Sequence, residues 1–277
     1  MNDTDKPDAD GRRSVVLAVE TSSRIGSVAL AIDGAQIEES VFSGPMQHST
    51  EIFPAMEALL TRHGCTTRDI DQIHIAVGPG SFTGLRIATT LAKAMHLAQG
   101  VRIVAVSSLD VVAAGLSDTP EEGQAPARPT PVPNRIVALF DAKRGQFYAS
   151  VYERVPVGQE APQSIVEDAP RYEYRIPAPQ GAMWQKVHPD SLMTASEILE
   201  RFAASEPLGV LGDGLLYHRD EFTRANATIL PERYWGPRAA CVYRLGRQEA
   251  LAGRFADPLA LTPFYLRGPQ VTLRSRP

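Results

Sequence analysis

The chain has 277 residues, of which 43% are apolar and 22% charged, as in an ordinary globular protein with room for one large domain or two small ones. Its net charge of −4 argues against a domain whose main task is to grip RNA, because phosphate binding usually leaves a strongly basic surface. No apolar run reaches the roughly 18–20 residues of a membrane span, and the polar stretch 1–13, which we expect to be disordered, carries no targeting segment. Any RNA contact would have to be local or belong to a partner.

Only two cysteines occur, Cys65 and Cys241. Two isolated cysteines give no disulfide framework, and a reducing cytoplasm fits this usage. Each cysteine is expected to act as a small buried hydrophobe.

The first hundred residues after position 13 predict one α/β lobe. Apolar runs predict strands, Asp33-Gly34 is a hairpin signal between the second and third of them, and two stretches have helical spacing of apolar residues. Gly100 is expected to end the second helix. In chain order the strands are expected at 14–19, 26–32 and 36–42, a helix at 48–60, a strand at 73–77, a helix at 85–99 and a strand at 101–106.

The rest of the chain predicts a second lobe with long loops. Residues 116–134 are rich in Pro, Glu and Gly, and 155–189 are Pro-rich with weak periodicity, so no helix is expected in either stretch. Thr194 and Glu197 form a capping box at a helix start. Strands are expected at 135–141 and 147–152, joined by a hairpin at 143–145, then a helix to about 204, a strand at 208–211 and a helix at 238–252. The domain prediction is a first lobe at 14–113, completed by the helix near 238–252, a reduced second lobe at 114–237, and an extended tail at 253–277.

The sharpest motif is the glycine-rich loop 78–84, GPGSFTG, between a predicted strand and a predicted helix. Free backbone N–H groups at a helix start can bind an anion, which makes Gly78, Gly80, Ser81 and Thr83 candidates for a phosphate loop. The pattern is neither a Walker A motif nor the dinucleotide fingerprint. The alternative is that the glycines permit a tight turn and close packing, with Ser81 or Thr83 as the N-cap.

A second candidate loop is the polar turn at 20–24. In actin-like ATPases such a turn holds metal-phosphate, which makes Glu20, Thr21 and Ser22 candidates for a degenerate phosphate loop. The alternative is a plain polar hairpin turn. Gly212-Asp213-Gly214 is the remaining loop of this kind.

Metal and hydrolase patterns are missing from the sequence. No two of the six histidines have the i, i+4 spacing of a helical metal site, and there is no Gly-x-Ser-x-Gly nucleophile elbow. Asp141, beside Lys143 and Arg144, could be catalytic, but turn chemistry explains it as well. His48 is expected on the surface or as a cap at a helix start.

Six stretches of the chain together resemble the bacterial TsaB/YeaZ family of tRNA threonylcarbamoyladenosine biosynthesis proteins. The most specific are GPGSFTGLRI at 78–87 and DAKRGQFY at 141–148. The others are LAVETSS at 17–23 with SVAL at 27–30, HS at 48–49, VSSL at 106–109 and PFYLR at 263–267. They extend over nearly the whole predicted folded chain.

The resemblance implies an actin/Hsp70/sugar-kinase (ASKHA) type fold with two related α/β lobes, the second reduced. It implies a non-catalytic subunit without cofactor or metal, which pairs with the transferase TsaD and the ATPase TsaE. That complex installs N6-threonylcarbamoyl on adenosine 37 of tRNAs that read codons beginning with A. The subunit would reach tRNA indirectly, and a homodimer is a second form that the resemblance allows.

The resemblance also places the partner or dimer seam on the two helices of the first lobe. The expected seam residues are His48, Ile52, Met56, Gly84, Leu85, Ala88, Ala92 and Met95. From the small-residue stripe Gly84, Ala88 and Ala92 alone, ordinary core packing is the competing interpretation. Ala88→Arg is expected to block partner binding while the fold persists.

The catalytic paralogue TsaD carries two histidines at i, i+4 after the strand that matches 101–106, and the aligned positions here are Ser108 and Val112. Since valine cannot ligate a metal, the resemblance implies no catalytic metal. Three alternatives stay open: an ATP-dependent small-molecule kinase of the same fold, a metallopeptidase, and a homodimer with a partner unrelated to tRNA.

Overall fold

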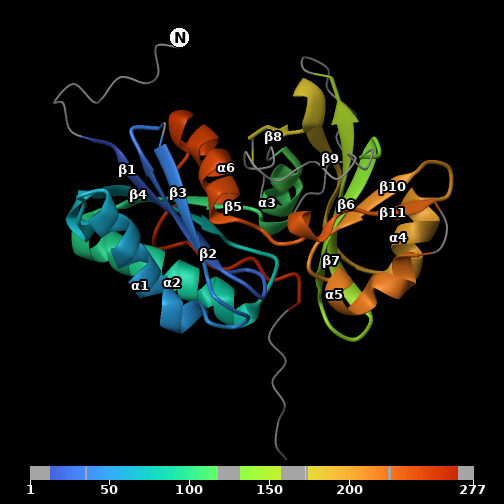
Figure 1. Ribbon diagram of the computed structural model, residues 1–277, viewed down its shortest axis with the longest axis horizontal. Helices are drawn as coiled ribbons and strands as arrows, with labels where there is room; N and C mark the ends of the chain where they lie inside the picture. Colours follow the sequence, from blue (N-terminus) through green and yellow to red (C-terminus); the bar gives the residue numbers. More distant parts are fainter. Residues whose placement is uncertain are drawn as a thin grey trace, which may run out of the picture.

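The computed structural model describes residues 13–34, 36–117, 132–156, 172, 174–223 and 226–267. They form two mixed β-sheets that stand side by side with helices around them (Figure 1). The expected disorder at 1–13 and the predicted loop at 116–134 lie mostly outside the described residues, as do the middle of the second Pro-rich stretch and the end of the tail. Across the described part of the chain, no helix combines the length and the apolar character needed to cross a membrane.

The first sheet has the strand order β3-β2-β1-β4-β5. β2 pairs antiparallel with both β1 and β3, whereas β1, β4 and β5 run parallel. Asp33 and Gly34, with φ of 52° and 73°, turn the chain between β2 and β3 as their sequence predicts. All five strands confirm the predicted ones to within a few residues: β1 Val15–Glu20, β2 Ser27–Ile32, β3 Gln36–Val41, β4 Ile70–Ala76 and β5 Arg102–Val106.

Helices cover both faces of this sheet. α1, His48–Arg62, lies against β2 and β3, and α2, Phe82–Gln99, lies against β4 and β5. α6, Ala239–Leu251, packs on the opposite face and contacts all five strands (Figure 1). Alternate residues of β1 therefore enter two cores, one shared with α1 and α2 and one shared with α6.

The second sheet repeats the topology of the first. Its order is β11-β10-β6-β7-β9-β8, with β6, β7 and β9 as an antiparallel meander and β10 and β11 added parallel to β6. In the same way the first sheet is a meander of β1, β2 and β3 with β4 and β5 added beside β1. The strands are β6 Arg135–Asp141, β7 Gln146–Val155, β8 Ile176–Pro177, β9 Met183–Thr194, β10 Leu208–Leu211 and β11 Ala227–Ile229.

Three shorter helices complete the described fold: α3 Ser108–Ala114, α4 Ala195–Phe202 and α5 Leu215–His218. Thr194 and Glu197 form the predicted capping box of α4. The sequence did not predict α3, α5, β8, β9 or β11. α3 lies between α6 and β6, so one continuous core runs from the inner face of the first sheet through α6 and α3 to the second sheet.

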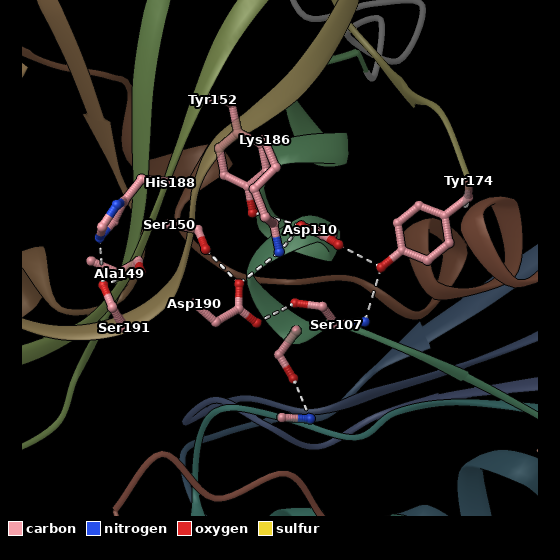
Figure 2. A network of polar contacts seen from close by, with 12 residues as sticks. Ser107, Asp110, Ala149, Ser150, Tyr152, Tyr174, Lys186, His188, Asp190 and Ser191 are labelled. Atoms are coloured by element: carbon pink, nitrogen blue, oxygen red, sulfur yellow. Dashed lines mark hydrogen bonds and ion pairs between the residues drawn. The ribbon is translucent and has the colours of Figure 1, made fainter. Parts of the chain in front are cut away.

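A polar network crosses this core and ties α3 to the second sheet (Figure 2). Lys186 Nζ on β9 lies 2.8 Å from Asp110 Oδ1 on α3 and 2.6 Å from Asp190 Oδ1 on β9. The Lys186 side chain is 26% exposed, and those of Asp110 and Asp190 are 4% and 7% exposed. Two buried carboxylates thus share one ammonium group.

Hydroxyl groups add further hydrogen bonds to both carboxylates of the network, at the oxygens that Lys186 contacts and, through Tyr174, at Asp110 Oδ2. Tyr152 and Tyr174 donate to Asp110 at 2.7 and 2.5 Å, and Ser150 Oγ donates to Asp190 Oδ1 at 2.5 Å. Burial, followed by the charge of Asp110, raises the pKa of both tyrosines well above the ordinary value. Both phenols therefore remain neutral donors.

Ser107, the N-cap residue of α3, extends the network toward the first sheet. Its Oγ donates to Asp190 Oδ2 at 2.9 Å, and its backbone N–H donates to the hydroxyl of Tyr174 at 3.0 Å. Since β5 ends one residue before Ser107, the end of that strand is held directly against β9.

Lys186→Met should lower the free energy of unfolding by about 3 kcal/mol, because it leaves two buried carboxylates without their cation. The matched control is Lys143→Met. Lys143 Nζ lies 2.5 Å from Asp141 Oδ2 but its side chain is 75% exposed, so its loss should cost at most about 1 kcal/mol. Urea unfolding measures both, and equal losses would contradict the role assigned to the network.

Candidate functional site

The loops that follow the parallel strands of both sheets meet at one place, which we call the lobe junction. It contains the turn 20–26 after β1, the loop 77–81 after β4, the hairpin turn 142–145 after β6 and the loop 212–214 after β10. Contacts across it include the Arg24 N–H, which donates to Asp213 Oδ2 at 3.4 Å. In open α/β sheets ligands bind at the carboxyl ends of the strands, so the junction is the candidate site.

The structure brings the two predicted phosphate loops of the first lobe into direct contact. A Cβ on Gly84 would lie 1.8 Å from the Thr21 carbonyl oxygen, and one on Gly80 would lie 2.3 Å from that of Ser22. The Thr21 hydroxyl donates to the Gly84 carbonyl at 2.7 Å. These glycines are required because the turn after β1 packs directly onto the start of α2.

That packing also uses donors that an anion would need. The Ser81 N–H donates to the Ser22 carbonyl at 2.7 Å. Of the two predicted N-cap residues, Ser81 and Thr83, it is Ser81 that caps α2. Its Oγ accepts from the Gly84 N–H at 3.3 Å. The geometry therefore favours the packing interpretation of the glycine-rich loop over the phosphate interpretation.

The loop 212–214 shows the same construction. A Cβ on Gly212, whose φ is 123°, would lie 1.9 Å from the carbonyl oxygen of Leu139, and one on Gly214 would lie 2.5 Å from the Leu139 side chain. These glycines let the loop pack onto β6.

Glu20 is the most unusual group of the junction. Its side chain is fully buried, with Oε1 accepting from the Ser22 N–H at 2.5 Å and from Ser22 Oγ at 2.6 Å. Among the described residues no donor reaches Oε2. Burial raises the pKa of Glu20 to about 7 against the hydrogen bonds from Ser22, with a smaller contribution from Asp213.

Asp213 and Asp141 are neighbours whose pKa values are shifted in opposite directions. Burial raises the pKa of Asp213 to about 6. Burial also acts to raise the pKa of Asp141, but Lys143 outweighs it with a backbone N–H at 2.7 Å and Nζ at 2.5 Å, and the pKa is lowered. Asp141 is thus used in its own turn, as the turn interpretation predicts, and Asp213 is the carboxyl group of the two that is more easily protonated.

The C-terminal tail connects the two sides of the junction. Phe264 N–H donates to the Val77 carbonyl at 2.7 Å, at the end of β4. Three residues later Arg267 Nη1 donates to the Ala142 carbonyl at 2.6 Å, in the hairpin after β6, and its Nη2 donates to Gln146 Oε1. The segment 263–267 therefore bridges the lobes.

His48 is neither on the surface nor a cap, which corrects the prediction. It is 2% exposed, its Nε2 lies 3.0 Å from the Ser23 carbonyl oxygen, and Gln47 is the N-cap of α1. Burial lowers its pKa. A Cβ on Gly26 would lie 2.6 Å from its ring, so His48 fills the space under the turn after β1.

The residues expected to form the partner seam are all buried within the first lobe. Apolar spacing on a helix identifies the face turned toward its own sheet, so these side chains lie in the core of the lobe, and a seam on these helices, which stays a prediction, would have to use their outer sides. Ala88 is 0% exposed, and Ala88→Arg would therefore bury a cation in the core and unfold the lobe. The eight buried residues are His48, Ile52, Met56, Gly84, Leu85, Ala88, Ala92 and Met95.

Ser108 and Val112, the positions aligned with the histidines of the catalytic paralogue, have structural roles. Ser108 Oγ accepts from the Gly78 N–H at 3.1 Å, and Val112 is fully buried in the core between the sheets. In the part of the chain that the structure describes, no group of three or more His, Cys, Asp or Glu side chains could hold a metal ion. Cys65 and Cys241 form no disulfide with each other, with Cys241 buried and Cys65 half-buried.

Tyr217 could not be identified as a junction residue from the sequence, whereas its neighbours Arg24 and Lys143 lie in turns that the sequence does mark. Arg24 lies over the ring of Tyr217, 5.0 Å from its centroid, and the Lys143 ammonium lies 5.8 Å from the same ring. Tyr217 stands on the four-residue helix α5, which has no periodicity to mark it. For the C-terminal tail, the PFYLR motif at 263–267 was the one feature of the sequence that marked it as important.

Comparison with known proteins gives a family for the chain. The family model of TsaD, the tRNA N6-adenosine threonylcarbamoyltransferases, matches residues 45–189. Curated relatives from Bacillus subtilis and Escherichia coli, both named tRNA threonylcarbamoyladenosine biosynthesis protein TsaB, are 33% and 31% identical. Each match covers 50% of this chain and 55% of the relative, so the chain spans about half the length of these two relatives. The TsaB protein of Haemophilus influenzae is 21% identical over 95% of this chain and 97% of its own length.

Solved structures show the fold. YeaZ from Pseudomonas aeruginosa superposes with a TM-score of 0.66 at 22% identity, covering 91% of this chain and 100% of that one. An uncharacterized protein with similarity to peptidase YEAZ from the same species gives 0.67 at 23% identity, over 92% and 100%. The predicted two-lobed actin/Hsp70/sugar-kinase fold is confirmed.

The contribution of Glu20 to the free energy of unfolding should fall as pH rises from 5 to 8, against the opposite contribution of the buried His74, whose pKa burial lowers to about 3. Glu20 binds its proton more tightly in the folded chain, where its pKa is about 7 instead of 4.5, so this stabilisation is complete below pH 4.5 and is lost as pH rises through 7. The shift corresponds to a contribution on the order of 3 kcal/mol, and Asp213 adds to it in the same direction.

Urea midpoints at pH 5 and pH 8 test this dependence. Glu20→Gln should raise the midpoint at pH 8 relative to that at pH 5, because the amide does not titrate, whereas Glu57→Gln on the exposed side of α1 should leave the wild-type slope. The same slope in wild type and Glu20→Gln would rule Glu20 out as its source.

Gly84→Ala should lower the free energy of unfolding by about 3 kcal/mol, because the methyl group would lie 1.8 Å from the Thr21 carbonyl oxygen. Gly115→Ala is the control. Gly115 has a helical φ of −61° with no atom within 4 Å of the added Cβ, so stability should stay equal or rise by about 0.5 kcal/mol. Thermal unfolding of both variants decides the matter, and a neutral Gly84→Ala would contradict the close packing.

Proposed function

We propose that this chain, which belongs to the TsaD family and within it to the TsaB/YeaZ group, is a non-catalytic partner subunit in the synthesis of threonylcarbamoyladenosine in tRNA. Its partners would be a TsaD homologue as transferase and a TsaE homologue as ATPase, acting in the cytoplasm on adenosine 37. The proposal rests on the match to the TsaD family model, which agrees with the likeness in fold to YeaZ. It is supported by the junction, where the glycine-containing loops pack against each other.

The geometry of the junction supports the non-catalytic part of the proposal. A kinase of this fold needs loops that present backbone N–H groups to phosphate. Here Gly80 and Gly84 bring the two loops of the first lobe into van der Waals contact, and the buried Glu20 carboxyl group stands beside them. An anion placed there would find the Ser81 and Gly84 N–H groups already bonded within the protein. It would also lie beside the Glu20 carboxyl group, which ionises near pH 7.

The residues at the aligned histidine positions support the same conclusion. Ser108 holds the loop after β4, and Val112 is core. Replacing either by a metal ligand would cost a contact that the fold uses. A metallopeptidase has no support in this arrangement.

We place the partner surface on the outer side of α1 and α2. The inner sides of both helices are used by the first lobe, but Phe53 on α1 is 56% exposed and Leu97 on α2 is 79% exposed. Exposed large apolar side chains on neighbouring helices are typical of an interface. The same surface could pair with a second copy of the chain.

Co-elution with TsaD from the same organism tests the proposal. Wild type should co-elute and should be required for threonylcarbamoyl transfer to tRNA by the mixture. Phe53→Glu combined with Leu97→Glu should abolish co-elution while thermal unfolding stays close to wild type, because both positions are exposed. Leu259→Glu, at a residue 86% exposed outside both helices, is the control and should co-elute normally.

The outcomes separate the parts of the proposal. If wild type never associates with TsaD, the subunit role loses its support. If wild type associates and the double variant does so equally well, the role stands and the surface is elsewhere.

A further inference from the structure

We propose that the rim of the lobe junction binds a single-stranded segment of RNA, with its cations on the phosphates and its aromatic rings on the bases. The junction rim consists of Arg24, Arg86, Lys143, Arg144 and Arg267 with Phe82, Tyr217 and Tyr265. The inference rests on the proposed function for the identity of the RNA, a tRNA. It goes beyond that function, because it assigns this subunit a direct RNA contact.

On the second-lobe side, direct contacts make the rim contiguous. Arg24 and Lys143 both lie on the Tyr217 ring, at 5.0 and 5.8 Å from its centroid. Arg144 is the next residue in the same hairpin turn, and Arg267 donates to the Ala142 carbonyl at 2.6 Å. Four cations thus gather around one turn and one exposed tyrosine.

The tail carries the rim back to the first lobe. Tyr265, two residues before Arg267, lies 5.1 Å from the Phe82 ring and accepts from Arg86 Nε at 3.3 Å. The Arg86 guanidinium lies 3.9 Å from the Phe82 centroid. Phe82 follows Ser81, whose N–H is bonded to Ser22 in the turn that carries Arg24, so the rim closes on itself.

The charge of the rim opposes that of the chain. Five cations collect at one place on a protein with a net charge of −4. The carboxyl groups they surround are Asp141, which pairs with Lys143, and Asp213 and Glu20, whose pKa values are raised. An excess of positive charge therefore remains at the rim near neutral pH, as a polyanion requires.

The hairpin turn holds its cations in a conformation that such residues rarely adopt. Lys143 and Arg144 have φ of 66° and 60°, and Gly145 follows with 71°. Glycine or asparagine takes these left-handed positions more easily than lysine or arginine. Backbone strain of this kind collects at functional sites, and here it presents two exposed cations side by side.

The aromatic residues favour RNA over an acidic protein segment. Tyr217 is 60% exposed and Phe82 is 38% exposed, and a guanidinium lies over each ring. Planar arginine–aromatic pairs bordered by cations match the stacking platforms and charged grooves that bind single-stranded nucleic acid. An acidic peptide would pair with the cations, but its carboxylates would not stack on the rings of Tyr217 and Phe82.

The test uses the assembled complex and a tRNA transcript that reads codons beginning with A. Lys143→Asn with Arg144→Asn keeps residues suited to left-handed φ while it removes both charges. We expect the tRNA affinity to fall about 3- to 10-fold at physiological salt, and the slope of log affinity against log salt to decrease by about 1.4, or about 0.7 for each lost phosphate contact. Tyr217→Ala should weaken binding at least about fivefold with the salt slope unchanged.

The control is Arg102→Gln with Arg201→Gln. Both arginines also lie over aromatic rings, at 4.6 and 5.2 Å from the centroids of Phe255 and Phe202. Arg102 begins β5, and Arg201 lies in α4, shortly before β10 begins. Each therefore lies toward the amino ends of the parallel strands, away from the junction at their carboxyl ends. This variant should bind tRNA as the wild type does.

Unchanged affinity and salt slope in the rim variants would overturn the inference, while normal complex formation and transfer in the same samples would leave the proposed function standing. Loss of co-elution with TsaD or TsaE in the rim variants would also overturn it, in favour of a protein on the rim. If the control variant lost as much tRNA affinity as the rim variant, any two positive charges on the protein would contribute equally. That result would contradict a specific binding site at the rim.

Discussion

The contact between the turn after β1 and the start of α2 is the constraint on which the junction depends. No side-chain atom fits between Gly84 and the Thr21 carbonyl, or between Gly80 and that of Ser22. Because the two backbones touch, Glu20 is sealed under the turn and its carboxyl group holds its proton to about pH 7. The same contact removes the Ser81 and Gly84 N–H groups from any ligand. A loop with the sequence of an anion site is thereby used as a packing element.

The sequence predicted much of this fold because its elements carry local signals. All five strands of the first sheet, β6, β10, the cap of α4 and the Asp33-Gly34 turn came from apolar runs, capping residues and turn chemistry. α3 escaped because it is buried on every side, so its seven residues show no helical period. β9 escaped for the opposite reason: Lys186 and Asp190 point into a polar network instead of an apolar core, and the strand reads as loop.

The candidate site was predictable only in part, because its residues lie far apart in the chain. The glycines of 78–84 and the turn at 20–24 were identified separately. The structure shows that the glycines leave room for the backbone carbonyl groups of that turn. A periodic apolar stripe such as Ile52 and Met56 indicates burial in the lobe itself, so it carries no information about which side of the helix faces a partner. Arg24, Tyr217 and Arg267 come from three segments whose meeting depends on the relative position of the lobes, which no local pattern encodes.

That relative position is itself set by chemistry between the lobes. In an enzyme of this fold that closes on a nucleotide, the lobes must move relative to each other, and the material between them must tolerate it. Here one continuous core and the Asp110–Lys186–Asp190 network join the end of β5 to β9, and the tail bridges Val77 to Ala142. Breaking such buried ion pairs is costly, so the arrangement favours a fixed angle between the lobes. A fixed angle suits a surface that must be presented to a partner, and it suits a rim whose cations come from both lobes. In the proposed function, the second lobe would hold the rim in place, and the contacts that close the junction would leave catalysis to the partner.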